Sequence, residues 1–202
     1  MLTKAEDVAF LFVDHQSGLI QTVKDIPVHD LRTNAASLAK AANLLGAPTI
    51  YTESVPDGPN GPIIPEIKQN APDAVYVKRT GEINAWDCKA FVEAVKVTDK
   101  QTLIISGIWT SVCVALPALS AIGAGYTVYT VIDASGDVSI ASRDITIARL
   151  AHAGAITVST TGMLAELQKT WNREDAEDWG AVYASVSPNY GAAMEQYYST
   201  QK

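Results

Sequence analysis

Short apolar runs alternate along this chain with longer segments that have helical periodicity, and this alternation constrains the fold more than any other feature. Residues 8–14 are rich in Val and Phe and end in an acid, which is the pattern of a strand buried on both faces. Apolar residues then recur every three or four positions from Leu31 to Leu45, and Gly46 stops this pattern. The order predicts a unit in which a helix connects two parallel strands.

The same alternation continues to residue 159. Further strands are predicted at 48–52, 74–78, 101–107, 126–132 and 155–159, and further helices at 86–97, 112–125 and 139–154. Residues 53–65 are predicted to form a loop because six of these thirteen residues are Pro or Gly. We therefore expect an α/β protein with three α/β/α layers and a mostly parallel six-stranded sheet.

The length of 202 residues favours a single domain over residues 1–202. Beyond residue 160 the chain is predicted to be helical to about Trp171, and it then becomes acidic and aromatic. Exposed aromatic surface is costly, so aromatic residues in such a position either cover the sheet or meet another subunit. We expect residues 160–202 to form a helical and aromatic C-terminal extension that makes contacts in a homo-oligomer.

Charge and hydropathy patterns exclude two classes of partner. The net charge is -7 and the basic residues are scattered, so we expect no binding to nucleic acid. The apolar runs are shorter than the roughly 18 residues that span a membrane, so we expect no membrane partner. The start of the chain lacks the pattern of a secretory signal, and the two cysteines, Cys88 and Cys113, are interpreted as free thiols. A cytoplasmic location is expected.

Four side chains that could take part in catalysis stand at or directly after the ends of predicted strands, where ligands bind in open α/β sheets. Asp14 follows the first strand, Lys78 and Arg79 stand at the end of the third, and Cys113 follows the fourth. Singly, each has an ordinary explanation as a turn former, a solvated edge or a small buried residue. Together they form the acid, cation and nucleophile of a catalytic site.

The turn that carries Cys113 adds a prediction about its ionisation. Residues 107–113 run from the end of a strand into the start of a helix, and the exposed N–H groups there favour a thiolate. We therefore expect a lowered pKa for the Cys113 thiol. Asp14 is expected to accept or return its proton, with a cation at Arg79 or Lys78 stabilising the anions.

Separated motifs in the same order resemble a known family. The order Asp, then Lys or Arg, then Cys, with Val-Asp-His-Gln at 13–16 and Gly-Ile-Trp-Thr-Ser-Val-Cys-Val at 107–114, resembles the isochorismatase-like cysteine hydrolases. Residues 58–62 and 83–87 are similar to the YcaC-like bacterial subgroup of that family. The resemblance covers residues 5–200 and implies the isochorismatase-like hydrolase fold.

The resemblance also implies a catalytic triad of Asp14, the basic residue at position 79 and Cys113. The family usually has a lysine in this triad, whereas alignment through residues 83–86 places Arg79 there. Arginine cannot exchange a proton, so Arg79 is expected to act through charge and orientation only. Lys78 remains the weaker candidate.

A cis peptide bond before the cysteine is a further feature of the family, and it corresponds here to Ile108–Trp109. It implies an oxyanion hole made by the backbone amides of Trp109 and Cys113. Asn84, Trp86 and Trp109 are expected to bind substrate, with core packing or subunit contact as an equally weighted alternative.

Metal binding distinguishes another branch of the family. Nicotinamidase members hold zinc or iron with an Asp and several His residues between the first acid and the basic residue. Here His occurs only at positions 15, 29 and 152, so neither a metal site nor another cofactor is expected. His15 and Cys88 are interpreted as structural residues.

The leading hypothesis is a metal-independent cysteine hydrolase that acts on a small amide or related C–N bond through a thioacyl intermediate. The alternatives are a nicotinamidase-type amidase and a non-catalytic, oligomeric, thiol-reactive protein. The subgroup resemblance implies a ring-like homo-oligomer, with an octamer as one form. The sequence does not identify the physiological small-molecule substrate.

Overall fold

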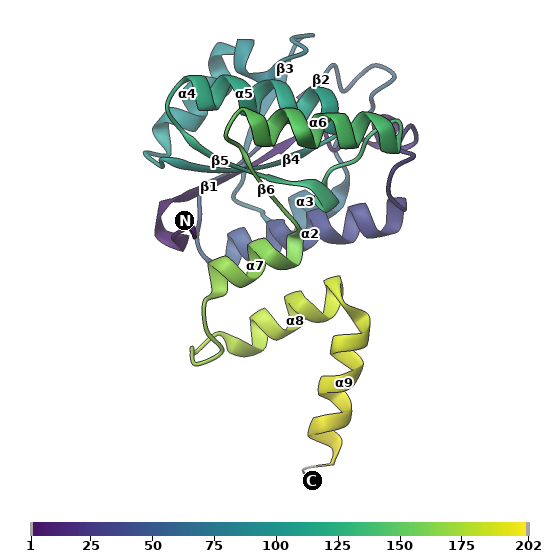
Figure 1. Ribbon diagram of the computed structural model, residues 1–202, viewed down its shortest axis with the longest axis vertical. Helices are drawn as coiled ribbons and strands as arrows, with labels where there is room; N and C mark the ends of the chain where they lie inside the picture. Colours follow the sequence, from purple (N-terminus) through teal and green to yellow (C-terminus); the bar gives the residue numbers. More distant parts are fainter. Residues whose placement is uncertain (1, 201–202) are drawn as a thin grey trace.

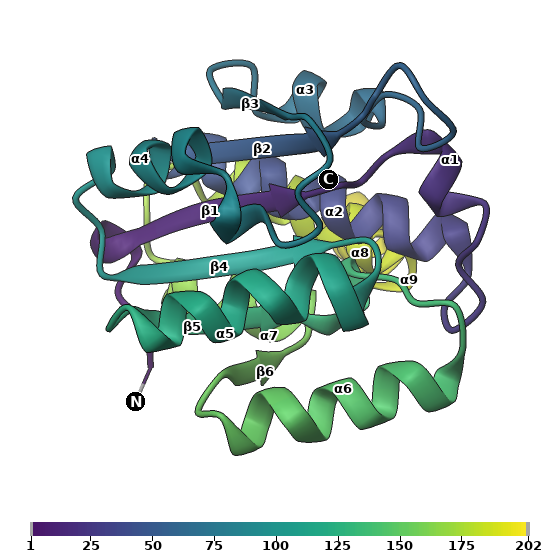
Figure 2. The ribbon, with the colours of Figure 1, turned by 90° about the horizontal axis from the view of Figure 1, so that it is seen from above.

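The computed structural model describes residues 2–200 and contains one central sheet of six parallel strands. The strand order is β3-β2-β1-β4-β5-β6, with helices on both faces (Figures 1 and 2). This arrangement confirms the predicted three-layer α/β fold. The strands are β1 (Val8–Val13), β2 (Thr49–Ser54), β3 (Val75–Arg79), β4 (Thr102–Gly107), β5 (Thr127–Val131) and β6 (Ile156–Val158).

The helices form two layers. Helices α4, α5 and α6 cover one face of the sheet, and α2, α3 and α7 cover the other, with α8 packed on α2 (Figure 1). The α-helices are α1 (Ser17–Ile20), α2 (Val28–Leu44), α3 (Pro65–Asn70), α4 (Lys89–Val97), α5 (Ala115–Gly123), α6 (Ile140–His152), α7 (Thr160–Gln168), α8 (Ala176–Val186) and α9 (Pro188–Ser199). Shorter helical turns are η1 (Ala5–Asp7), η2 (Ala85–Asp87), η3 (Thr110–Val114) and η4 (Ile132–Ala134).

Strand β1 lies at the centre because both of its faces are covered. Phe10 and Phe12 face the layer that contains Leu38 of α2, whereas Leu11 faces the layer that contains Phe91 of α4. Successive side chains of a strand point to opposite faces, so a continuous apolar run supplies two cores at once. This is why β1 has no polar residue before its end.

The direction of chain winding reverses between β1 and β4. Strands β2 and β3 extend the sheet from one side of β1, and β5 and β6 extend it from β4 on the other side. In open α/β sheets such a reversal leaves a crevice at the carboxyl ends of the two strands. Asp14 follows β1 at this point, and Ile108 to Cys113 follow β4.

Several element boundaries differ from those predicted. Strand β3 extends through Arg79, and the helix predicted at 112–125 begins two residues earlier as the π-helical turn η3. The sequence missed α3, which has Pro65 in its first turn, where proline's missing N–H is tolerated. The helix predicted at 86–97 is divided into η2 and α4.

The C-terminal extension is not uniform. Helix α7 and the buried Trp179 and Val182 of α8 belong to the main core, whereas α9 has no buried residue and projects away from the body (Figure 1). Within residues 2–200, no helix is long and apolar enough to cross a membrane. The single-domain boundaries stay a prediction, and residues 1 and 201–202 of that prediction lie outside the described part of the chain.

Candidate active site

Asp14 and Arg79 form a buried ion pair where the parallel strands end, which we call the carboxyl edge of the sheet. Arg79 Nη2 donates a hydrogen bond to Asp14 Oδ2, and both residues are only 1% exposed. Asp14 adopts a positive φ of 59° directly after β1, a conformation that Asp tolerates better than most residues. Burial raises the pKa of the Asp14 carboxyl above its usual range, although the charge and hydrogen bond of Arg79 oppose this effect.

Further hydrogen bonds fix the direction of the Arg79 guanidinium. Its Nε donates to Thr52 Oγ1 at 3.1 Å, and its Nη1 donates to the carbonyl oxygen of Glu82. Thr52 in turn donates to the carbonyl of Val77 at 2.7 Å. Arg79 therefore reaches Asp14 from the edge strand β3 by passing over the end of β2.

Lys78 points away from this site. Its Nζ pairs with Asp57 Oδ2 at 2.8 Å, and its side chain is 53% exposed. Adjacent strand residues face opposite sides of a sheet, so only one of the two cations can enter the crevice. The structure brings Arg79 to Asp14 and leaves Lys78 in solvent.

Cys113 lies in η3, and the charges of both Asp14 and Arg79 act on its sulfur. Burial and the negative charge of Asp14 raise the pKa of the Cys113 thiol well above its ordinary value, while Arg79 lowers it to a smaller extent. The expectation of a lowered thiol pKa is therefore wrong for this chain. The sequence pattern indicated the helix start but gave no measure of how deeply the sulfur is buried.

The peptide bond between Ile108 and Trp109 is cis, as the family resemblance implies. The backbone N–H of Cys113 donates to the carbonyl of Trp109 at 2.8 Å, so this amide is already engaged within η3. Among the described residues, the Trp109 amide has no acceptor. The indole Nε1 of Trp109 donates to Thr22 Oγ1 at 2.6 Å, which fixes the ring.

Asn84 and Trp86 are engaged elsewhere in the described chain. Asn84 donates from Nδ2 to Ser120 Oγ at 3.1 Å and accepts from the amide of Trp86 at 3.0 Å. The Trp86 ring packs edge-on against Phe91 and Tyr126 at centroid distances of 6.3 and 5.8 Å. These contacts lie along α4 and α5, and among the described contacts none joins Asn84 or Trp86 to the Asp14–Arg79 pair.

Gln16 anchors the loop between β2 and α3, a role that the sequence reasoning missed. Its Nε2 donates to the carbonyls of Ser54 and Gly61 at 3.1 and 2.5 Å, and its Oε1 accepts from the Ser54 amide at 3.0 Å. A Cβ on Gly18 would lie 2.0 Å from the carbonyl oxygen of Pro59, so the two backbones require glycine at this contact. The signal was present, because Gln16 belongs to the motif at 13–16.

His15 is fully buried beside Asp14. Its Nε2 lies 2.9 Å from the carbonyl oxygen of Ala134, and its Nδ1 has no partner among the described residues. Burial lowers the pKa of His15 to about 4, so the ring is neutral at pH 7. Within residues 2–200, no three His, Cys, Asp or Glu side chains are grouped so as to hold a metal ion.

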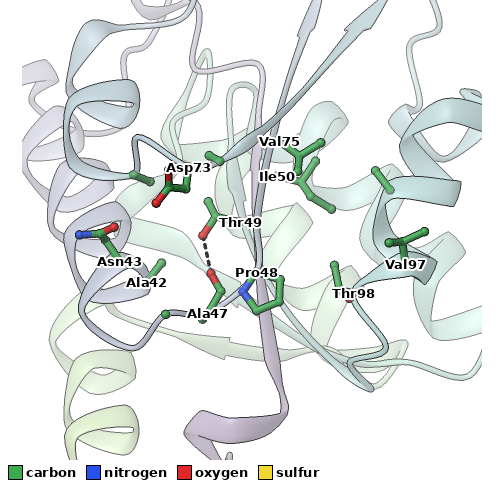
Figure 3. Close-up of a pocket in the computed structure, with 14 residues that line it drawn as sticks. Ala42, Asn43, Ala47, Pro48, Thr49, Ile50, Asp73, Val75, Val97 and Thr98 are labelled. Carbon is green, nitrogen blue, oxygen red and sulfur yellow. Dashed lines mark hydrogen bonds between the residues drawn. The ribbon is translucent and has the colours of Figure 1, made fainter.

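A cavity of about 430 Å³ lies where the parallel strands begin, which we call the amino edge of the sheet (Figure 3). It lies between the end of α2, the starts of β2 and β3, and the end of α4, with Pro48, Val75 and Val97 in its wall. The residues predicted to be catalytic are absent from its described lining. This cavity therefore does not mark the crevice that holds Asp14, Arg79 and Cys113.

These features define a class of protein. The model of the isochorismatase domain matches residues 8–162, which is most of the chain, and the chain therefore belongs to the isochorismatase family. Among its relatives, it is 44% identical over 191 residues to the probable hydrolase YcaC of Escherichia coli K12, covering 95% of this chain and 91% of that protein. The predicted resemblance to the family and to its YcaC-like subgroup is confirmed.

Solved structures agree with this assignment. YcaC from Pseudomonas aeruginosa, described with hexane-2,5-diol and covalent acrylamide, matches with a TM-score of 0.94 and 43% identity over 97% of this chain and 96% of that one. The Escherichia coli YcaC structure, described as an octameric hydrolase of unknown specificity, matches with a TM-score of 0.95 and 42% identity. That match covers 99% of this chain and 98% of the other.

Proposed function

We propose that this chain is a metal-independent cysteine hydrolase that hydrolyses a small amide or a related C–N bond. The observation that supports it best is the meeting of Asp14, Arg79 and Cys113, which are far apart in sequence, in one buried crevice. Family membership and the similarity to YcaC, a probable hydrolase, support the general activity. Covalent acrylamide in the Pseudomonas aeruginosa relative supports a reactive nucleophile in such proteins, because acrylamide is an electrophile.

The first chemical step requires removal of the thiol proton during attack. Because the pKa of Cys113 is raised, the thiol is protonated at rest. As the bond from sulfur to the carbonyl carbon forms, Asp14 takes this proton, and the carbonyl oxygen becomes an oxyanion. The raised pKa of Asp14 makes its carboxylate a stronger base than an exposed aspartate.

The oxyanion is held by the backbone amides of Trp109 and Cys113 in this proposal. The Trp109 amide is available, whereas the Cys113 amide must share the hydrogen bond that it makes to the Trp109 carbonyl. Collapse of the tetrahedral intermediate breaks the C–N bond, and Asp14 returns the proton to the leaving nitrogen. A thioacyl enzyme remains.

Water then completes the reaction. Asp14 accepts a proton from the attacking water, the carbon–sulfur bond breaks, and the proton passes to the departing sulfur of Cys113. Arg79 does not transfer a proton. We propose that it orients Asp14 and balances negative charge, and that Trp109 contacts the substrate, with Asn84 and Trp86 as further substrate-contact residues.

Acylation measured by intact mass tests the proposal. An activated acetyl ester or amide should add one acetyl group to the wild-type chain and to Cys88→Ser, and none to Cys113→Ser. A screen of small amides should then show turnover that is lost in Cys113→Ser. Acylation that persists in Cys113→Ser would contradict the assignment of the nucleophile.

The same screen separates the alternatives. Nicotinamide turnover that is lost on chelation and restored by zinc would indicate a nicotinamidase-type amidase. Disulfide or sulfenic acid formation at Cys113 without acylation would indicate a non-catalytic, thiol-reactive protein. The cytoplasm is the proposed compartment, in keeping with the two free thiols, Cys88 and Cys113.

We also propose a homo-oligomer that uses α8 and α9. A groove of about 640 Å³ between these helices is lined by Trp171, Tyr190, Met194 and Tyr198, and Tyr198 is 60% exposed. The octameric description of Escherichia coli YcaC supports an octamer here. Sedimentation should show an assembly of this size, and truncation after Ser187 should produce smaller species. A wild-type chain that sediments at 21.5 kDa would refute the proposal.

A further inference from the structure

Asp137 lies in the loop after η4, the helical turn that follows β5, and it holds the start of the turn that carries Cys113. Its Oδ2 accepts the backbone N–H of Ser111 at 2.8 Å, and its Oδ1 accepts the Ser111 hydroxyl at 3.1 Å. The same Oδ1 accepts the amide of Val138 at 2.8 Å, and the residue is fully buried. A buried carboxylate that accepts three hydrogen bonds is fixed in direction, because losing any of them would leave buried charge unsatisfied.

Two neighbouring contacts support Asp137 from behind. Its amide donates to Asp25 Oδ1 at 2.7 Å, and its carbonyl accepts the amide of Lys24 at 2.9 Å. The same segment carries Thr22, whose hydroxyl holds the Trp109 ring. Thr22 therefore fixes the Trp109 ring. Lys24 and Asp25 fix the backbone of Asp137, whose carboxylate in turn binds Ser111.

The residue before Asp137 also binds this turn. The carbonyl of Gly136 accepts the amide of Thr110 at 2.8 Å. A Cβ on Gly136 would lie 2.8 Å from Val23 Cγ2, so any larger residue here would force the Val23 side chain to shift. Thr110 and Ser111, which follow β4, are therefore fixed by the loop that follows η4.

We infer that Asp137 is a positioning residue, which holds Ser111 so that the sulfur of Cys113 faces Asp14 and Arg79. This inference rests on the proposed function, since it concerns the geometry of the same nucleophile. Asp137 does not touch the reacting atoms and acts through two residues of chain. Loss of the Asp137 carboxylate should therefore weaken the electrostatic interaction of the Cys113 thiol with its two charged neighbours.

Asp133 provides a matched control. It also follows β5, and its Oδ1 accepts both the amide and the hydroxyl of Thr160 at 2.6 and 2.8 Å. Asp133 thus caps the start of α7 much as Asp137 holds the start of η3, but on a helix that does not carry Cys113. Loss of either carboxylate should lower stability, and only loss of Asp137 should alter the thiol.

The test is the pH dependence of Cys113 alkylation by iodoacetamide, read by peptide mass spectrometry. Asp14→Asn should lower the midpoint by about one pH unit, because it removes a negative charge beside the thiol and leaves Arg79 in place. In an Asp137→Ala background this shift should fall below about half a unit. In an Asp133→Ala background it should keep its full size.

A full shift in the Asp137→Ala background would overturn the inference. The milder Asp137→Asn keeps an acceptor for the Ser111 amide and should give an intermediate shift; it serves if Asp137→Ala does not fold. Ser111→Ala keeps the backbone hydrogen bond and should retain most of the shift. If Asp14→Asn shifts nothing in the wild-type background, the Asp14–Cys113 contact itself is refuted, whereas failed acylation with an intact shift refutes only the hydrolase.

Discussion

The two edges of the sheet use their space in opposite ways. The carboxyl edge is filled by buried polar side chains, including Asp14, Arg79 and Asp137, whereas the amino edge has an open cavity with a largely apolar wall (Figure 3). Free volume therefore does not mark the proposed active site of this chain. Buried charge does, because a charged group is held out of water only where neighbouring groups compensate for it.

The largest expected effect is at Arg79. Arg79→Ala leaves the Asp14 carboxylate buried without its cation and should lower the free energy of unfolding by about 3–5 kcal/mol. It should also reduce acyl-enzyme formation at Cys113, whereas Arg79→Lys should retain part of it because the charge survives. Urea unfolding and acylation rates measure the two effects.

Lys78→Ala is the matched control for this prediction. Its side chain is exposed and pairs only with Asp57 in the described contacts, so stability should change by less than about 0.5 kcal/mol. Loss of acylation in Lys78→Ala, with normal acylation in Arg79→Ala, would show that the wrong cation had been assigned.

His15 predicts a pH dependence at the same edge. The folded pKa of about 4 lies below the usual 6.5, so the unfolded chain binds more protons between these values. Stability from this group is fully present above pH 6.5 and falls by about 3 kcal/mol as the pH approaches 4. His15→Gln should reduce this slope in urea unfolding, and the exposed His29→Gln should not. Equal slopes for all three chains would contradict the burial argument.

The smallest effect is expected at the amino edge. Ala94 on α4 lines the cavity there, and Ala94→Leu should fill part of it and raise the free energy of unfolding by about 0.5–1 kcal/mol. Alkylation of Cys113 should stay within about twofold of wild type, because the substitution lies at the opposite end of the strands. A larger change would mean that the two edges are coupled.

The sequence predicted the fold and the convergence of the three central residues well, for physical reasons. Continuous apolar runs such as β1 require cover on both faces, and parallel strands place Asp14, Arg79 and Cys113 at one edge. Choosing between Lys78 and Arg79 required the strand to be one residue longer than predicted. Their roles in catalysis remain proposals.

The rest depended on contacts that periodicity does not encode. The direction of the Cys113 pKa shift follows from its burial, and the hydrogen bond from Ser111 to Asp137 spans 26 residues. The acid directly beyond the predicted strand at 126–132 is Asp133, whereas Asp137 stands five residues beyond the end of that strand, so it lacked the signal that marked Asp14. The substrate-binding role of Asn84 and Trp86 stays a prediction, and their described side-chain contacts are with Ser120, Phe91 and Tyr126.

The loop between β2 and α3 has a consequence for local dynamics. Its backbone is bonded to the residues after β1: the amides of Ser17 and Gly18 donate to the carbonyls of Pro62 and Asn60, and the Ile64 amide donates to the carbonyl of His15. A loop rich in Pro and Gly would ordinarily exchange its amide hydrogens quickly with solvent. Here the amides of Ser17, Gly18 and Ile64 should exchange as slowly as those of β1, since opening them requires the end of the sheet to separate.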